Sequence, residues 1–382
     1  MSRIKLTASP ERSQLLRQMA SKNTVEAAEA RSVFAEFVSE VIKKTFTQAI
    51  VFSNLYEEIR VTENSPQTIP LDPYDDLSAE NFMVVTMQQT AGGLPTNYDY
   101  GIEELAFQTY KLASQVSFSE KYLRAARLDV VAKGIQHMAD EILRKREDNS
   151  IAPVFQNVAT ANITTNIAGV TTTYNNIFRT DVAGQLYLND FINAMVRASR
   201  LRVSSVGGTA GNTNWLRGIT DLVVSPEVIG DLRRVAFNPM NTKQAVAGTT
   251  SIPAPQELRE EVYKTAGIPS FYDVNIIPIY EFGVGQRYNT LFANIAGSTA
   301  YTDFTGGNSA SFSNSTSEIM LGIDATVGAM KKPIIVEDEA SNEFRTRPDD
   351  QFVSREEKVG FYTTVQEGAI VTDSRAFVLM IR

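Results

Sequence analysis

The stretch Val116–Asn149 most constrains the fold, because its apolar residues recur with the period of one long α-helix. Five apolar residues fall at steps of three and four and therefore share one helix face: Leu128, Val131, Ile135, Met138 and Ile142. Ser117 and Glu120 match a capping box, in which each side chain binds a backbone amide at the helix start. Arg144–Arg146 would then form the last turn, before a final asparagine that can adopt the left-handed stop. We therefore predict a spine helix over 117–148.

Composition places the chain among ordinary soluble proteins. With 382 residues, of which 43% are hydrophobic and 21% charged, it can bury a large core in two or three lobes. No apolar run is long enough to span a bilayer, and the N-terminus lacks a secretory signal, so we expect synthesis in a cytoplasm. The chain has no cysteine, which excludes disulfides and thiolate sites. The net charge of −8 argues against general affinity for nucleic acid.

The negative charge is concentrated in one segment. From Val61 to Glu104 there are eight acidic residues and no lysine or arginine. Prolines and glycines interrupt the segment, which predicts an extended β-hairpin with a long tip. Such a segment either faces water or binds a basic partner. Glu104–Phe118 alternates apolar and polar residues, as a strand leading into the spine would.

Other segments have simpler patterns. We predict helices over Pro10–Arg60, which pack on their own domain or on another protein, and over Leu186–Arg202, with Asn189 or Asp190 as cap. Further expected elements are a strand and a short helix in Thr220–Val235, strands in Val274–Phe282 and Tyr288–Ala296, and buried terminal strands in Val353–Arg382.

Few residues suggest catalysis or ligand binding. His137 is the only histidine and lies beside the apolar stripe of the spine, which favours a structural or interface role. The glycine-rich stretch Val206–Trp215 matches no phosphate-binding motif. Acidic groups at Asp72–Asp76 and Asp349–Asp350 lack the ligand spacing of a calcium loop. We therefore expect no catalytic, cofactor or metal residues. A hydrolase with two carboxylates distant in the chain stays open as a minor alternative.

Two stretches carry a resemblance to a known family. VSFSEKYLRAARLDVVAKGIQHMADEILRKRED is similar to the strand-then-spine segment of the major capsid proteins of tailed bacteriophages, the Hong Kong 97-like fold. EKVGFYTTVQEGAIVTDSRAFVLMI resembles the closing strands of that family. The resemblance implies an α+β fold in five parts. These are a helical N-terminal arm (1–65), an extended loop hairpin (66–104), a peripheral domain with the spine (105–185), an axial domain (186–340) and closing strands of the peripheral domain (341–382).

The resemblance also implies a function. Such a chain would self-assemble as hexamers and pentamers into an icosahedral head shell that encloses double-stranded DNA, in a virion assembled in the host cytoplasm. The alternative is the shell of an encapsulin-type nanocompartment; a phage tail protein is disfavoured by the long helices. The hairpin tip has no lysine, so we expect a shell without covalent crosslinks. Because no large region precedes Met1, a separate scaffolding protein is expected, besides a portal and a possible decoration protein.

In shells of this kind the extended loop and the arm lie over neighbouring subunits, which would supply the basic partner. We therefore predict that the acidic hairpin docks on basic residues of the spine of an adjacent subunit. The inter-subunit candidates are Asp72, Asp75, Asp76 and Glu80 on the hairpin, and Arg124, Arg127, Lys133, Arg144, Lys145 and Arg146 on the spine.

Overall fold

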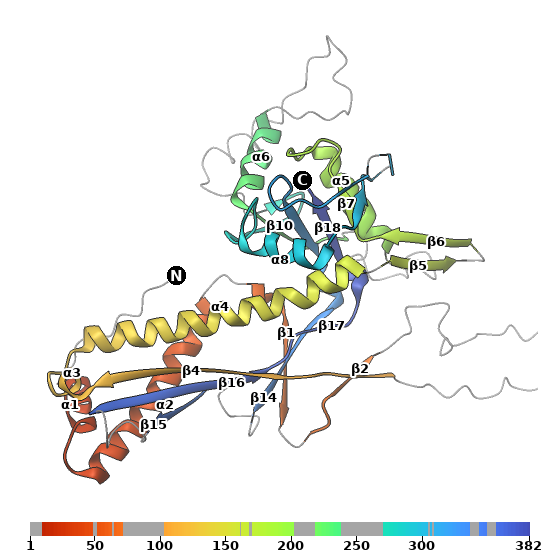
Figure 1. Cartoon of the computed structure of the whole chain (residues 1–382). Coiled ribbons are helices and arrows are strands. Elements are labelled where there is room, and N and C mark those ends of the chain that lie inside the picture. The colour runs from red at the N-terminus through yellow and green to blue at the C-terminus, as the bar shows by residue number, and fades with distance from the viewer. Residues whose placement is uncertain are drawn as a thin grey trace, which may run out of the picture. The chain divides into compact units, whose positions relative to one another are not determined.

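The computed structural model forms two compact units, each built from separate stretches of the chain (Figure 1). Unit 1 comprises Met1–Thr68, Ala106–Pro153 and Met330–Ile370, and unit 2 comprises Ile69–Leu105, Val154–Ala329 and Val371–Arg382. The residues that the structure describes are 10–48, 52–62, 65–71, 103–160, 162–167, 170–201, 218–237, 270–304, 306–307, 309–336, 344–349 and 357–382. Residues 72–102 of the predicted hairpin segment and the glycine-rich stretch Val206–Trp215 lie outside them.

Unit 1 begins with two helices, as the sequence predicted. Helix α1 spans Pro10–Met19 and helix α2 spans Thr24–Gln48. A single 3-10 turn, η1 (Phe52–Leu55), and strand β1 (Glu57–Thr62) follow, so the prediction of a helical arm is wrong for its last part. Strand β1 forms because it pairs in parallel with the apolar strand β14 (Met330–Val336).

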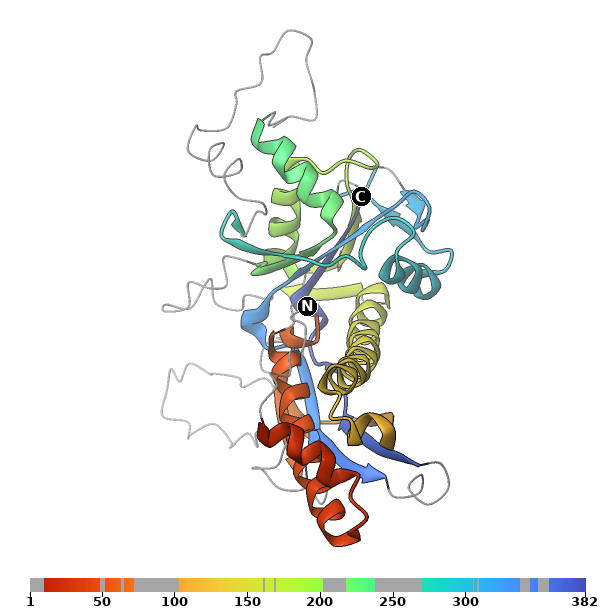
Figure 2. The ribbon, with the colours of Figure 1, turned by 90° about the vertical axis from the view of Figure 1, so that its left-hand side faces the viewer.

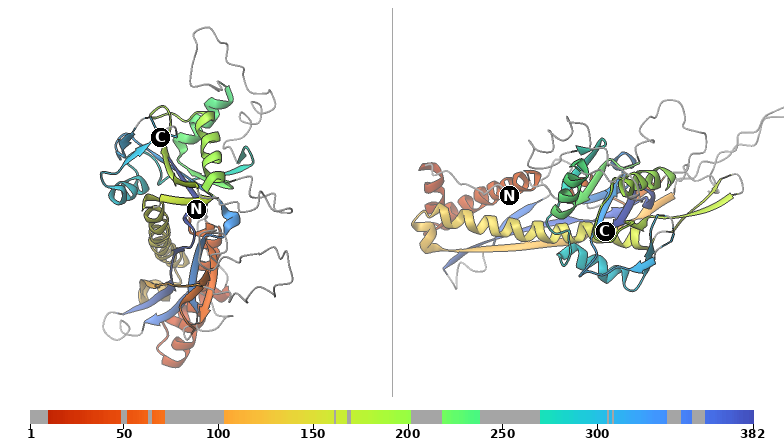
Figure 3. Two further views of the ribbon diagram at one scale, coloured as in Figure 1. Left: turned by 90° about the vertical axis from the view of Figure 1, so that its right-hand side faces the viewer. Right: turned by 90° about the horizontal axis from the view of Figure 1, so that it is seen from above.

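The sheet of unit 1 is organised around β16 (Lys358–Glu367). Strand β4 (Tyr110–Ser119) pairs with it antiparallel over ten residues, and β15 (Arg345–Asp349) pairs antiparallel on its other edge. Strands β1 and β14 join through the pair Ile334 and Glu367, and the short β17 (Ile370–Val371) pairs with β14. Figure 3 shows β4 running alongside the long helix α4 (Leu128–Thr160).

The spine differs from the prediction at both ends. Val116–Ser119 continue strand β4, because each residue pairs with β16, so Ser117 does not cap a helix. The short helix α3 (Glu120–Arg124) follows, and Ala126 then takes a φ of 50°, which interrupts the helix. Helix α4 starts at Leu128 and runs to Thr160 through Pro153, so Arg144–Arg146 lie in its middle. Its 33 residues give a rod of about 50 Å.

Helices α2 and α4 share the core of unit 1. Val131, Ile135, Met138 and Ile142 of α4 are buried, which confirms the predicted apolar face. Phe34 of α2 lies 5.1 Å from the ring of Phe361 on β16. Helices α4 (olive) and α2 (red) in Figure 2 therefore both pack on the same face of β16. The alternative of an arm that packs on its own domain is thus the one observed for α1 and α2.

Unit 2 contains a second six-stranded sheet with the order β7–β18–β13–β8–β10–β9. The strands are β7 (Ile177–Arg179), β18 (Phe377–Ile381), β13 (Ile319–Ile323), β8 (Asp221–Val224), β10 (Val274–Pro278) and β9 (Ser270–Phe271). The helices are α5 (Leu188–Leu201), α6 (Pro226–Phe237) and α8 (Arg287–Ala296). All residues of β13 and β18 are buried, as expected for central strands covered on both faces.

Shorter elements complete the described chain. Three two-stranded ribbons are β2 (Thr68–Leu71) with β3 (Glu103–Ala106), β5 (Asn162–Ile167) with β6 (Val170–Asn175), and β11 (Ala300–Thr302) with β12 (Ser309–Ser311). Single 3-10 turns are η4 (Ala325–Val327) and η6 (Ser374–Ala376).

Several predictions for unit 2 are confirmed and two are corrected. Helix α5 and the β8–α6 pair lie where they were predicted. Tyr288–Ala296, predicted as a strand, is helix α8, because its apolar residues recur at helical and not alternating spacing. The closing segment 341–382 is divided between the units: β16 belongs to unit 1, whereas β18 pairs with β13 and β7 in unit 2.

Candidate functional site

The predicted inter-subunit residues are the acids of the hairpin and three groups of spine cations. Asp72, Asp75, Asp76 and Glu80 lie outside the described residues. Arg124 and Arg127 flank the interruption between α3 and α4, and each has a carboxylate nearby. Arg124 Nη2 lies 2.5 Å from Glu120, and Arg127 Nε lies 3.7 Å from Asp129. Both arginine side chains remain 60% exposed, so these are weak surface pairs that another carboxylate can replace.

Lys133, Arg144 and Lys145 form the second group, on the exposed side of α4. Lys133 and Arg144 are about three helical turns apart and therefore lie on one face. Within the described part of the chain, none of the three has a carboxylate partner. The same side of the helix carries Glu141, which is also exposed. Lys133 and Arg144 thus share a helix face of mixed charge at about 17 Å from each other, whereas Lys145 lies about a third of a turn away.

Arg146 differs from the other candidates because it is buried. Its side chain is 3% exposed, and its Nε lies 2.7 Å from a carboxylate oxygen of Glu367, which has no exposed surface. The hydroxyl of Tyr110 donates to the other oxygen of Glu367 at 3.3 Å. Arg146 therefore joins α4 to β16 inside unit 1, and we leave it out of the surface candidates.

A second buried carboxylate lies next to Arg146 in the sequence. Glu147 accepts hydrogen bonds from the backbone N–H groups of Phe52, at 2.7 Å, and Ser53, at 3.0 Å. These two amides start the turn η1 and have no helical partners of their own. Burial raises the pKa of Glu147, and the hydrogen bonds and the positive charge of Lys332 oppose that rise. Glu147 therefore fastens the chain between α2 and β1 onto helix α4.

Two further polar side chains extend this buried group. The hydroxyl of Tyr56 donates to the backbone carbonyl of Ser150 at 2.6 Å, and burial raises the pKa of that hydroxyl. Lys332 on β14 is 2% exposed, and its Nζ lies 3.7 Å from the half-exposed Glu58 on β1. Buried ions of both signs thus connect α4 with three strands of unit 1. Because they are paired and inaccessible, they stabilise one arrangement of these elements and offer no binding site.

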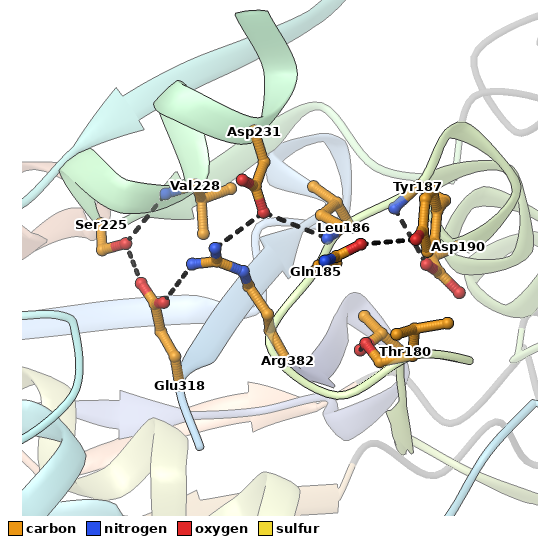
Figure 4. A network of polar contacts seen from close by, with 11 residues as sticks. Thr180, Gln185, Leu186, Tyr187, Asp190, Ser225, Val228, Asp231, Glu318 and Arg382 are labelled. Atoms are coloured by element: carbon orange, nitrogen blue, oxygen red, sulfur yellow. Dashed lines mark hydrogen bonds and ion pairs between the residues drawn. The ribbon is translucent and has the colours of Figure 1, made fainter. Parts of the chain in front are cut away.

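Unit 2 contains a polar network of its own around Arg382 (Figure 4). The guanidinium binds Glu318 at 2.6 Å through Nη1 and Asp231 at 2.8 Å through Nη2. Ser225 donates to Glu318, and its Oγ also accepts from the backbone amide of Val228 at 3.3 Å, which caps α6. Burial raises the pKa of Glu318, and Arg382 opposes the rise. The network ties the last strand of the sequence to β13 and α6.

Sequence reasoning missed most of these buried ions. Glu367 precedes a glycine, as in a turn, and Arg382 ends an apolar run, so the sequence around neither residue indicates a buried ion. A charged residue within or beside an apolar run is the sequence pattern that could indicate a buried ion. Lys332 lies within the buried strand β14, and Glu318 directly precedes the buried strand β13. The partner of each ion could not be identified, because it comes from a distant part of the sequence.

The histidine and acidic candidates of the sequence form no metal site within the described residues. This part of the chain contains no group of three histidine or acidic side chains close enough to hold a metal ion. His137 is exposed on α4, and Asp349 accepts a hydrogen bond from Gln115 at 3.0 Å, whereas Asp350 lies outside the described residues. None of the described helices is long and apolar enough to cross a membrane.

Comparisons with known proteins address the fold. The sequence matches no protein-family model and no curated protein. The structure resembles the capsid structure of cyanophage P-SCSP1u, with a TM-score of 0.50 and 12% identity over 87% of this chain and 88% of that chain. The capsid of a native GTA particle has a TM-score of 0.47 at 12% identity, over 87% of this chain and 89% of the other. An encapsulin from Synechococcus elongatus PCC 7942 has a TM-score of 0.41 at 9% identity, over 87% and 88%. The chain thus has the mixed helix-and-sheet fold of a phage capsid protein, as the two quoted stretches predicted.

Proposed function

We propose that this chain is a major capsid protein that self-assembles into the icosahedral head shell around a double-stranded DNA genome. One observation carries the proposal: the likeness to the cyanophage capsid spans 87% of this chain and 88% of the other, and thus includes both units. We further propose that the detailed topology is Hong Kong 97-like, with unit 1 corresponding to the peripheral domain and unit 2 to the axial domain.

The proposed function carries the partners that go with such a shell. Copies of the chain would form hexamers and pentamers, and a separate scaffolding protein, a portal and a possible decoration protein would complete the head. Packaged DNA would be contacted without sequence specificity, in keeping with a net charge of −8. The place of the protein would be the virion.

Electron microscopy of the expressed protein tests the proposal. We expect closed icosahedral particles, alone or on co-expression with the products of neighbouring genes. A protein that stays monomeric under all these conditions would contradict it. Particles purified from infected cells should protect DNA from nuclease; particles that contain protein cargo and no DNA would instead support an encapsulin-type compartment.

We also propose that the acidic hairpin of one subunit docks on helix α4 of its neighbour. The hairpin supplies Asp72, Asp75, Asp76 and Glu80, and the helix supplies Lys133, Arg144 and Lys145, with Arg124 and Arg127 at its start. The proposal is supported by the exposure of these cations and by the lack of basic residues in the hairpin. Each exposed pair contributes about 0–1 kcal/mol and is screened by salt, so the contacts would guide register more than hold the shell.

Charge reversal tests this docking separately from assembly itself. Replacing Asp75, Asp76 and Glu80 by lysine should slow assembly at low salt, and replacing Lys133 and Arg144 by glutamate in the same chain should restore it. Assembly that is unchanged at every ionic strength would refute the docking and leave the shell function intact.

A further inference from the structure

One face of the sheet of unit 1 is partly exposed: its side chains are exposed on β4 and half-buried on β16. Side chains alternate between faces along β16, and Val359, Phe361 and Val365 point into the core with α2 and α4. The opposite face, which we call the open sheet face, includes Tyr362 and the residues paired with that side of β16. On β4 these are exposed residues, among them Lys111 and Ala113.

Four cations lie on the open sheet face. Lys111 lies on β4, Arg345 and Arg347 on β15, and Lys358 on β16, and the strand register places all four on this face. The same register also places Asp349 of β15 on this face, where it accepts a hydrogen bond from Gln115 of β4. From the level of Lys111 to that of Lys358 the register advances eight residues, or about 27 Å.

Helix α2 presents the opposite charge. Glu26, Glu29, Val33, Glu36 and Glu40 recur at steps of three and four, so they form one stripe, and all are exposed. We call this the acidic stripe; it covers about 21 Å of helix. The only cation between Thr24 and Ile42 is Arg31, which is buried and donates to the backbone carbonyl of Met19 at 3.2 Å. At its centre Val33 is 55% exposed, an apolar side chain without cover from the described part of unit 1.

The two surfaces cannot meet within one chain. Phe34, Val38 and Ile42, on the buried side of α2, pack on the core face of the sheet, so the acidic stripe points away from the sheet altogether. The open sheet face lies on the far side of the same strands. The surfaces have opposite charge, similar length and opposite positions on one unit, which is the arrangement of a head-to-tail contact between copies.

We propose that the acidic stripe of one copy docks on the open sheet face of a second copy, with Val33 near Ala113 and the glutamates among Lys111, Arg345 and Arg347. The inference rests on the proposed shell function, because it requires copies of the chain to associate with one another. The apolar side of α2 is used inside its own unit, so only this charged side is available to a neighbour. A nucleic acid is the other polyanion that could occupy the face, and the net charge of −8 opposes it.

Disulfide trapping between two single-cysteine proteins tests the contact. The chain has no cysteine, so Val33→Cys and Ala113→Cys each introduce the only thiol. The two proteins are mixed with oxidised glutathione, and the disulfide-linked heterodimer is quantified. We expect several-fold more of it than from Val33→Cys mixed with Tyr280→Cys, a control thiol at a site that is 79% exposed on unit 2. Equal yields in the two mixtures would overturn the proposal.

Charge exchange gives a second, independent reading. Glu29→Lys with Glu36→Lys should lower trapping several-fold when present in the Val33→Cys protein. Lys111→Glu with Arg347→Glu in the Ala113→Cys protein should restore it. If trapping fails while a labelled DNA duplex binds the wild type and not the Lys111→Glu, Arg347→Glu protein, the face binds nucleic acid and the proposal is refuted. Micrographs of wild-type particles report the shell function separately, because particles can form whether or not these cysteines react.

Discussion

Gly134 lies at a close approach of helix α4 to strand β4, and its replacement by alanine tests that packing. A Cβ at this position would lie 2.5 Å from Cε1 and 2.9 Å from Cζ of Phe118, and 3.1 Å from Cγ2 of Val116. Phe118 cannot easily yield, because it is 4% exposed and packs near the ring of Phe361. Forcing a methyl group into such a site costs about 1–3 kcal/mol.

Helix propensity acts in the opposite direction. Alanine in place of glycine in a helix interior stabilises by about 1 kcal/mol. Gly230 in helix α6 isolates this gain, because a Cβ there meets no atom within 4 Å. We therefore expect Gly230→Ala to raise the unfolding free energy of unit 2 by about 1 kcal/mol. The change that Gly134→Ala causes in the unfolding free energy of unit 1 should be less favourable than this by about 1–3 kcal/mol.

Urea denaturation combined with hydrogen exchange measures both free energies of unfolding, with exchange in β4 reporting on unit 1 and exchange in α6 on unit 2. Adding Phe118→Leu to Gly134→Ala should recover part of the loss, relative to the sum of the two single variants, because a smaller side chain removes the clash. If Gly134→Ala stabilised its unit as much as Gly230→Ala does, the close approach of α4 to β4 would be refuted.

Three further predictions concern the buried ions. Arg146→Ala leaves Glu367 buried without its cation and should destabilise unit 1 by about 3–5 kcal/mol, whereas the exposed control Arg144→Ala should change its unfolding free energy by less than about 0.5 kcal/mol. Because the pKa of Glu147 is raised in the folded state, its contribution to stability is complete below about pH 4.5 and is lost as the pH rises through the raised pKa. The unfolding free energy of Glu147→Gln should therefore fall less than that of the wild type between pH 5 and pH 8. Equal slopes of unfolding free energy against pH would contradict the raised pKa. Arg382→Ala should lower the stability of unit 2 by about 3 kcal/mol in thermal unfolding, with Arg382→Lys intermediate, since both carboxylate partners are buried.

The elements that could be predicted are those in which the spacing of apolar residues along the sequence matches the side of the helix or strand that is buried. The stripe from Val131 to Ile142 and the run Phe377–Ile381 are buried as expected. The helix start was wrong because Ser117 and Glu120 form a correct local capping signal, which the pairing of β4 with a strand more than 230 residues away overrides.

The candidate site was predictable in part for the same reason. Exposed cations such as Lys133 follow from their place off the apolar stripe, whereas Arg146 lies beside that stripe, and its burial depends on Glu367. No local pattern identifies that partner. The acidic stripe of α2 is visible in the sequence only after the structure shows which side of the helix is buried.

The ion pair between Arg146 and Glu367 has a consequence for how β16 finds its place. Sliding a strand by one residue exposes its apolar side chains, but sliding β16 by two residues keeps Phe361 and Val365 on the core side. Hydrophobic burial therefore determines which face of β16 points into the core, but it does not distinguish the observed register from one shifted by two residues. A shift of two moves the carboxylate of Glu367 by about 7 Å, away from both the guanidinium and the hydroxyl of Tyr110, and leaves ions of both signs buried alone. The buried charges therefore favour the observed register of β16 over a register shifted by two residues, which the apolar residues alone would tolerate.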